Sequence, residues 1–233
     1  MKKLIRNIYN LLSISTPYFI IFNYIKNYFP NYRKKKQCLN IDEKIYQNFK
    51  SIDLTKKWFT NNLYFLSRNL STLKIKNVLE IGSYEGRSAI FFADIFRESK
   101  ISCVDTWSGS DEHQNINFKS IENNFDQNIE DLKNNQLLTK YKMTSDNFFY
   151  QNTAKFDFVY VDGDHSKDQV LKDLQNSWSI LNSNGFLLID DYMWWYYKNL
   201  EKNPASSVNI FINKNIDQIS KLIIWHQVLI QKK

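Results

Sequence analysis

From residue 77 onward, short hydrophobic runs alternate with longer stretches in which hydrophobic positions recur every three or four residues. Short runs bounded by polar residues predict strands, and the longer periodic stretches predict helices. The predicted strands are 77–81, 100–104, 141–143, 156–161 and 185–190. Strands that alternate with helices are typical of a parallel sheet covered by helices on both faces.

The two ends of the chain depart from this alternation. Residues 221–225 and 227–231 are strand-like and almost adjacent, which predicts an antiparallel edge, and residues 41–70 have a helical pattern. The length of 233 residues suits one α/β domain with an extension. We therefore expect an arm at 1–40 and a single domain at 41–233.

The positive charge of the chain is concentrated in the arm. Residues 1–36 carry eight cations and no acid, whereas the whole chain has a formal charge of +7, so the remainder carries −1. A nearly neutral body argues against a nucleic-acid partner. Aromatic residues between these cations favour peripheral contact of 1–36 with an anionic membrane surface, and the alternative is an arm packed on the body or on a second subunit of a homo-oligomer.

The most informative motif is VLEIGSYEGRS at residues 78–88. Gly82 allows a sharp turn directly after a strand, and Gly86 opens a helix whose amides and positive end face the turn. The spacing differs from the G-x-G-x-x-G of dinucleotide-binding turns. Glu80, at the strand end, would repel a pyrophosphate but could accept a hydrogen bond from an ammonium group. The alternative is an ordinary strand-to-helix turn.

Polar residues also follow the second and third predicted strands. Asp105 lies about twenty residues beyond the glycine turn, the spacing at which an acid meets ribose hydroxyls. Trp107 suits an adenine face, or else packs in the core. Ser145 and Asp146, after Thr144, suit the adenine edge, or else begin a helix.

The fourth and fifth predicted strands end in four acids: Asp162, Asp164, Asp190 and Asp191. Carboxylates that converge at adjacent strand ends repel one another unless protons, hydrogen bonds or a cation neutralise them. A hard divalent ion such as Mg²⁺ is the simplest partner. The alternative is that Asp164 and Asp191 cap helices while the other two accept backbone amides.

The glycine turn resembles the first motif of class I S-adenosylmethionine-dependent methyltransferases. Together with residues 157–192, which contain Asp162-Gly163-Asp164-His165, it is similar to the bacterial D-G-D-H methyltransferase family and to the related catechol and macrolide-sugar O-methyltransferases. This resemblance implies a Rossmann-like α/β fold with a mostly parallel seven-stranded sheet, an antiparallel C-terminal hairpin edge and N-terminal helices.

The resemblance also implies site residues. Asp162, Asp190 and Asp191 match the metal ligands of the catechol enzyme, although Asp191 stands where that enzyme has asparagine. His165 occupies the position of its catalytic lysine, and neutral imidazole can take a hydroxyl proton near pH 7. Asp164 is a second candidate base. The residues expected to bind S-adenosylmethionine are Glu80, Gly82, Ser83, Tyr84, Gly86, Ser88, Asp105, Thr106, Trp107, Ser145, Asp146 and Asp162.

The expected function is metal-assisted O-methylation of a small hydroxylated acceptor such as a sugar. The alternatives are a non-catalytic or membrane-associated binding protein on the same fold, and a nucleotide-sugar or nicotinamide-binding Rossmann enzyme.

Cys38 and Cys103 are far apart in the chain, which favours reduced thiols and a cytoplasmic setting. Ser166 to Gln169 read as a capping box at the start of the helix after His165.

Overall fold

A computed structural model describes residues 40–41, 58–109, 117–192, 194, 197–199, 202–224 and 226–233. The basic arm at 1–36 therefore lies outside the described residues, as do residues 37–39 and 42–57. Contacts between Cα atoms divide the chain into two compact units, with a boundary between Asn152 and Thr153. We call the described residues before this boundary the N-terminal unit, and residues 153–233 the C-terminal unit.

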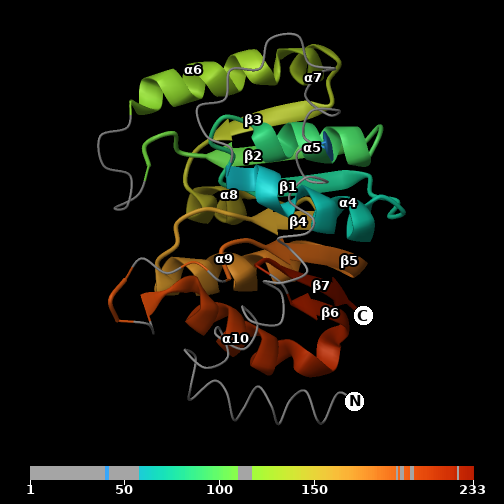
Figure 1. The fold of residues 1–233 in the computed structure, drawn as a ribbon, viewed down its shortest axis with the longest axis vertical. Coiled ribbons are helices and arrows are strands. Elements are labelled where there is room, and N and C mark those ends of the chain that lie inside the picture. Colours follow the sequence, from blue (N-terminus) through green and yellow to red (C-terminus); the bar gives the residue numbers. More distant parts are fainter. Residues whose placement is uncertain are drawn as a thin grey trace. The chain divides into compact units, whose positions relative to one another are not determined.

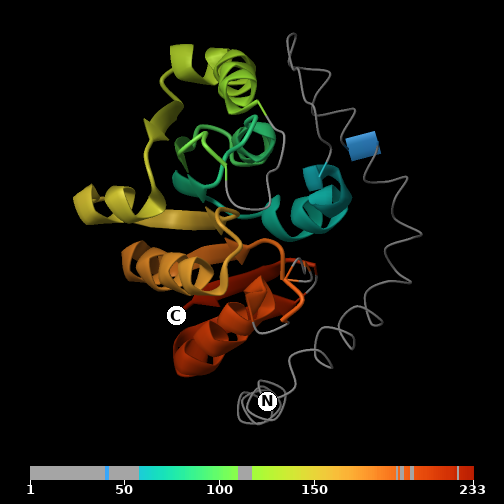
Figure 2. The same ribbon diagram turned by 90° about the vertical axis from the view of Figure 1, so that its left-hand side faces the viewer.

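The N-terminal unit holds three parallel strands in the order β3-β2-β1 (Figure 1). In Figure 2, helices α5 and α8 lie on opposite sides of these strands. The elements, in chain order, are η1 (Trp58–Asn62), α4 (Leu63–Leu70), β1 (Asn77–Ile81), α5 (Arg87–Ile95), β2 (Lys100–Asp105), α6 (Phe118–Asn128), α7 (Glu130–Asn134), β3 (Leu138–Lys142) and α8 (Ser145–Gln151).

The C-terminal unit holds the other four strands. Strand β4 pairs in parallel with β5, which pairs in antiparallel with β7, and β6 pairs in antiparallel with β7 at the edge. Helix α9 packs on β4 and β5, and α10 packs on α9. The elements are β4 (Phe156–Val161), α9 (Lys167–Ile180), β5 (Leu181–Ile189), α10 (Pro204–Asn215), η3 (Ile216–Gln218), β6 (Ile219–Ile224) and β7 (Val228–Lys232).

The full strand order is β3-β2-β1-β4-β5-β7-β6. This is the predicted mostly parallel seven-stranded sheet with an antiparallel C-terminal hairpin, so the fold prediction is confirmed. Strands β1 and β4 have the predicted bounds. Strand β3 starts three residues before the predicted run, because its lysines hide the pattern, as is common at sheet edges.

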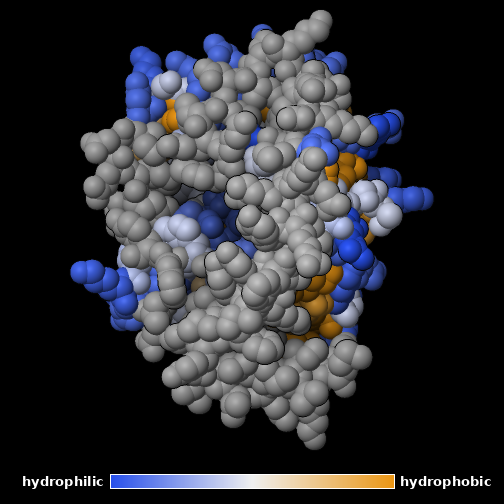
Figure 3. All heavy atoms as spheres, viewed as in Figure 1, coloured by the Kyte–Doolittle hydropathy of each residue, from blue (hydrophilic) through white to orange (hydrophobic). Residues whose placement is uncertain are grey.

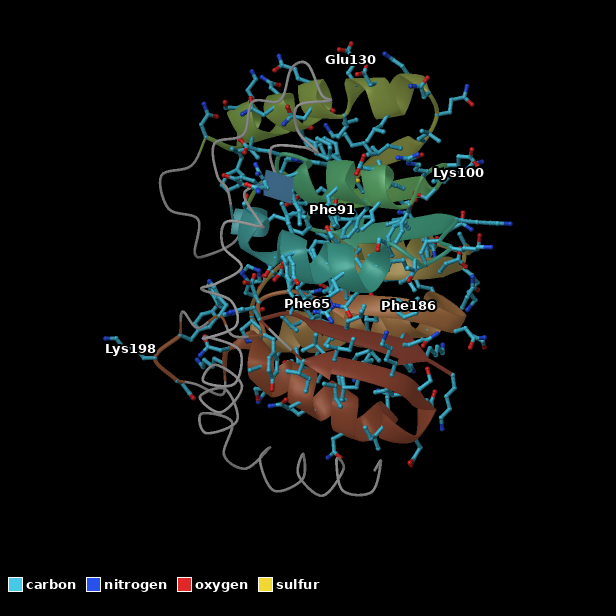
Figure 4. The ribbon with its side chains drawn as sticks, turned by 45° about the vertical axis from the view of Figure 1, so that its right-hand side comes forward. Phe65, Phe91, Lys100, Glu130, Phe186 and Lys198 are labelled. Atoms are coloured by element: carbon cyan, nitrogen blue, oxygen red, sulfur yellow. The ribbon has the colours of Figure 1, made fainter. Side chains whose placement is uncertain are left out.

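Hydrophobic side chains fill the interior of each unit. Helix α5 is buried nearly all round, and its Phe91 ring contacts Phe59 and Phe92 at centroid distances of 5.4 and 5.6 Å. Figure 4 shows Phe91 inside the N-terminal unit, whereas Lys100 and Glu130 point outward. The described surface in Figure 3 is mostly hydrophilic, with a few hydrophobic side chains toward the right-hand edge of the view.

Two further expectations concern the start of α9 and the membrane. The capping box is wrong: Ser166 occupies the N-cap but its side chain makes no capping hydrogen bond. Asp164 Oδ1 accepts the Ser166 amide at 2.7 Å, the amide that Gln169 would accept in a capping box. Among the described helices, none combines the length and hydrophobicity that crossing a bilayer requires.

Candidate active site

The glycine turn has the backbone that its sequence predicts. Gly82 and Gly86 have φ angles of 85° and 83°, and Tyr84 between them also has a positive φ of 47°. A Cβ atom added at Gly86 would lie 3.0 Å from Ile129 and 3.1 Å from Phe125. Only glycine combines this backbone with so little space, and Gly86 is the N-cap of α5, as expected.

Glu80 is fully buried at the end of β1. Its Oε2 accepts hydrogen bonds from Ser83 Oγ at 2.6 Å and from Cys103 Sγ at 3.3 Å. Burial raises the pKa of Glu80 to about 7, against the opposing effect of hydrogen bonds from Ser83, Ser88 and Cys103. The carboxyl group is therefore poised to ionise near neutral pH when a positive charge approaches.

Asp105 ties the loops after β1 and β2 together. Its Oδ2 accepts the backbone amides of Ser83 at 2.8 Å and of Tyr84 at 2.9 Å, and its Oδ1 accepts the amide of Trp107 at 2.7 Å. Trp107 Nε1 donates to the carbonyl of Tyr84 at 2.8 Å. The predicted ribose acid thus lies against the glycine turn, where it also fixes the shape of the turn.

Trp107 packs in the core, which is the alternative to a position against an adenine face. The side chain is only 4% exposed, its ring lies 4.7 Å from that of Phe125, and Lys140 Nζ lies 4.4 Å from the ring centroid. Its neighbour Thr106 accepts the Ser108 amide at 3.2 Å. A role for Trp107 beside adenine stays a prediction.

Ser145 and Asp146 form the first turn of α8, which Thr144 caps by accepting the Asn147 amide at 3.2 Å. Both residues therefore begin a helix, as the alternative interpretation of this segment predicts. The negative charge of Asp146 in the first turn suits the helix dipole. A role for these residues beside adenine stays a prediction.

The C-terminal unit brings together three of the predicted site residues, Asp162, His165 and Asp191. His165 Nε2 lies 2.8 Å from Asp191 Oδ2 and 3.6 Å from Asp162 Oδ1. The side chains are between 16 and 29% exposed, whereas both ring nitrogens of His165 are buried. One ligand atom from each residue lies within 4.8 Å of the other two, which suits a metal ion.

Asp190 makes different contacts from the other two predicted metal acids. Its Oδ2 accepts hydrogen bonds from the Tyr160 hydroxyl and, at 2.8 Å, from Gln227 Nε2, and its Oδ1 accepts the Asp191 amide at 2.8 Å. The Tyr160 hydroxyl also lies 2.9 Å from Asp162 Oδ2. Neither Tyr160 nor Gln227 was predicted. Tyr160 had a signal, because it precedes Asp162 by two residues and so shares a strand face with it.

The acids of this cluster are costly to ionise together. Burial, followed by the charges of Asp190 and Asp191, raises the pKa of Asp162 well above its usual range. Burial and Asp191 raise the pKa of Asp190 to about 6 although three hydrogen bonds oppose the shift. A bound cation would relieve this repulsion, and the carboxylate oxygens fit a hard divalent ion beside His165.

Two neighbours complete this part of the site. Asp164 is exposed, and its Oδ1 accepts the Ser166 amide. The Trp194 ring lies 4.8 Å from the His165 ring and 6.4 Å from the Tyr197 ring. An aromatic wall therefore flanks the imidazole.

The pKa of Glu80 leads to a prediction about stability. Because its folded pKa of about 7 exceeds the ordinary 4.5, its stabilising contribution is complete below pH 4.5 and is lost as pH rises through 7. The wild type should lose up to about 3 kcal/mol of unfolding free energy relative to Glu80→Gln between pH 5 and pH 8. Urea unfolding at both pH values measures this difference, and parallel behaviour of the two proteins would refute it.

Residues 79–192 match a family model described as a methyltransferase domain. The match spans the glycine turn, Asp105 and the acidic cluster through Asp191. No curated protein matches the sequence significantly.

Solved structures share the fold at low sequence identity. A Staphylococcus aureus protein provisionally assigned as a caffeoyl-CoA O-methyltransferase is 15% identical, with a TM-score of 0.58 over 86% of this chain and 99% of its own. A Bacillus cereus O-methyltransferase in complex with S-adenosylhomocysteine is 15% identical, with a TM-score of 0.54 over 86% and 91%. The MycE methyltransferase of mycinamycin biosynthesis, in complex with Mg, S-adenosylhomocysteine and mycinamycin VI, is 16% identical, with a TM-score of 0.53 over 82% and 54%.

The chain therefore contains a methyltransferase domain at residues 79–192, and its strand order is the one predicted for a class I methyltransferase. The prediction of a methyltransferase is thereby confirmed.

Proposed function

We propose that this enzyme transfers the methyl group of S-adenosylmethionine to a hydroxyl oxygen of a small acceptor, such as a sugar, with the help of a divalent cation such as Mg²⁺. The observation that carries this proposal is the cluster of Asp162, His165 and Asp191 in a chain with a methyltransferase glycine turn. Carboxylates beside an imidazole can hold a cation and take a hydroxyl proton, which are the two tasks of metal-assisted O-methylation.

The glycine turn provides the donor site in this proposal. S-adenosylmethionine supplies an electrophilic methyl group on a sulfonium sulfur. Glu80 suits its ammonium group because a buried carboxyl with a pKa of about 7 loses its proton readily beside a positive charge. Asp105, already held by the turn amides, retains lone pairs for ribose hydroxyls.

The acidic cluster provides the acceptor site. Asp162, Asp190 and Asp191 are the proposed ligands of the cation, which would lower the pKa of an acceptor hydroxyl. His165 takes the hydroxyl proton, and the nearby Asp191 carboxylate stabilises the resulting imidazolium. Asp164 is the weaker candidate base, because it is exposed and is occupied with the Ser166 amide.

The MycE complex supports the proposal, because that protein of the same fold holds Mg, S-adenosylhomocysteine and mycinamycin VI together. The aromatic wall of Trp194 beside His165 suits the apolar face of a sugar or a ring. The contact of residues 1–36 with a membrane or with a second subunit, and the cytoplasmic setting, stay predictions.

A screen of small molecules tests the acceptor class. Purified enzyme with deuterated-methyl S-adenosylmethionine should give labelled methyl ethers with sugars or related polyols, and EDTA should reduce their yield by about tenfold or more. Mass spectrometry measures the products. Label found in amines only, or yields that EDTA leaves unchanged, would contradict O-methylation or the metal, respectively.

A further inference from the structure

Gln227 is a buried polar residue that the proposed chemistry does not use. It lies between β6 and β7 at the antiparallel end of the sheet and has no exposed surface. Its Nε2 donates to Asp190 Oδ2 at 2.8 Å. The amide orientation follows from charge, because Oε1 in that position would face a carboxylate oxygen.

Within the described residues, the oxygen of the Gln227 side-chain amide is buried without a contact that offsets the loss of water. This oxygen, Oε1, has no hydrogen-bond partner among the described residues. A buried polar atom without a partner destabilises the folded protein, whereas a hydrophobic side chain of the same size carries no such cost. Stability alone therefore does not explain a glutamine at this position.

Through its contact with Asp190, Gln227 is linked to Asp191. Asp190 Oδ1 accepts the amide of Asp191, whose φ of 53° is unfavourable for a residue with a Cβ atom. This conformation directs Asp191 Oδ2 to within 2.8 Å of His165 Nε2. Residues held in such backbone regions need support from their surroundings.

We propose that Gln227 is a positioning residue of the active site: it fixes Asp190, and Asp190 holds Asp191 in the conformation that presents its carboxylate to His165 and to a cation. The inference rests on the proposed function, since it assigns Asp191 to the metal and base site. The Tyr160 hydroxyl donates to the same oxygen of Asp190 as Gln227 does, so two side-chain donors hold this carboxylate.

The test compares Gln227→Met with Gln231→Met. Both changes remove a glutamine amide from the same end of the chain and keep a side chain of similar volume. The Gln231 side chain, however, donates to the carbonyl of Asn184, at 3.2 Å, and not to Asp190. Urea unfolding establishes that both variants are folded. If Gln227→Met fails to fold, Gln227→Leu, which also removes the amide donor to Asp190, serves in its place.

Two readouts decide the outcome. In the ¹⁵N spectrum of labelled histidine, the His165 signals, assigned by their loss in His165→Asn, should move in Gln227→Met and stay in place in Gln231→Met. The Mn²⁺ dissociation constant, measured by electron paramagnetic resonance, should rise by about tenfold or more in Gln227→Met only.

Unmoved His165 signals in a folded Gln227→Met protein would overturn the positioning role. A wild type that binds no Mn²⁺ would instead reject the proposed metal site, and the His165 signals would still decide whether Gln227 positions Asp191. The two failures are therefore distinguishable.

Discussion

Replacing Gly82 with valine should weaken the binding of S-adenosylhomocysteine by about a hundredfold or more. Gly82 has a φ of 85°, which costs a β-branched residue a few kcal/mol, and about 3 kcal/mol corresponds to about a hundredfold in affinity. The valine backbone would escape this strain by moving the amides of Ser83 and Tyr84 away from Asp105. Isothermal titration calorimetry measures the loss.

A matched variant separates the loss of the site from general strain. Asn184 in β5 has a φ of 63° and lies in the other unit, so Asn184→Val imposes a similar backbone cost outside the glycine turn. It should lower the unfolding free energy without changing the affinity for S-adenosylhomocysteine. Wild-type affinity in Gly82→Val would reject the turn as the donor site.

The second large effect, on kcat, is expected from replacing the proposed base, His165, or the first acid of the cluster, Asp162. His165→Ala should lower kcat by about 10²- to 10⁴-fold, the range expected for a general base. Asp162→Asn should have a comparable effect and should also weaken Mn²⁺ binding, because it removes a charge from the cluster. Initial rates of methyl transfer with the acceptor from the screen measure both.

Asp157→Asn is the matched control for Asp162→Asn. Asp157 lies in the same strand, where its carboxylate accepts Asn182 Nδ2 at 2.8 Å, and it takes no part in the proposed chemistry. Its variant should keep wild-type kcat. If His165→Ala also keeps wild-type kcat, the histidine is not the base, and Asp164 becomes the residue to replace.

The sequence predicted the fold because its buried strands read clearly. The bounds of β1 and β4 follow directly from hydrophobic runs, whereas β5 begins four residues before its predicted start, at polar positions 182–184 that the hydrophobic pattern does not register. The positive φ angles at Gly82 and Gly86 follow from the residue type, because glycine is the residue that such turns require.

The contacts within the candidate site were harder to predict. The sequence located the acids after β4 and β5, but it did not show that Asp190 accepts three hydrogen bonds while Asp191 turns toward His165. Gln227 had no signal, since it comes from a strand pair that carries no motif. Trp107 was ambiguous because an aromatic side chain suits both a ligand and the core, and only its burial places it in the core.

The most direct test of the account is methyl transfer from labelled S-adenosylmethionine into a small-molecule extract by the wild type and by Asp162→Asn. The account predicts that the wild type incorporates label into hydroxylated small molecules and that Asp162→Asn loses this incorporation while it still binds S-adenosylhomocysteine. Equal incorporation by both proteins, or none by a wild type supplied with Mg²⁺, would contradict it.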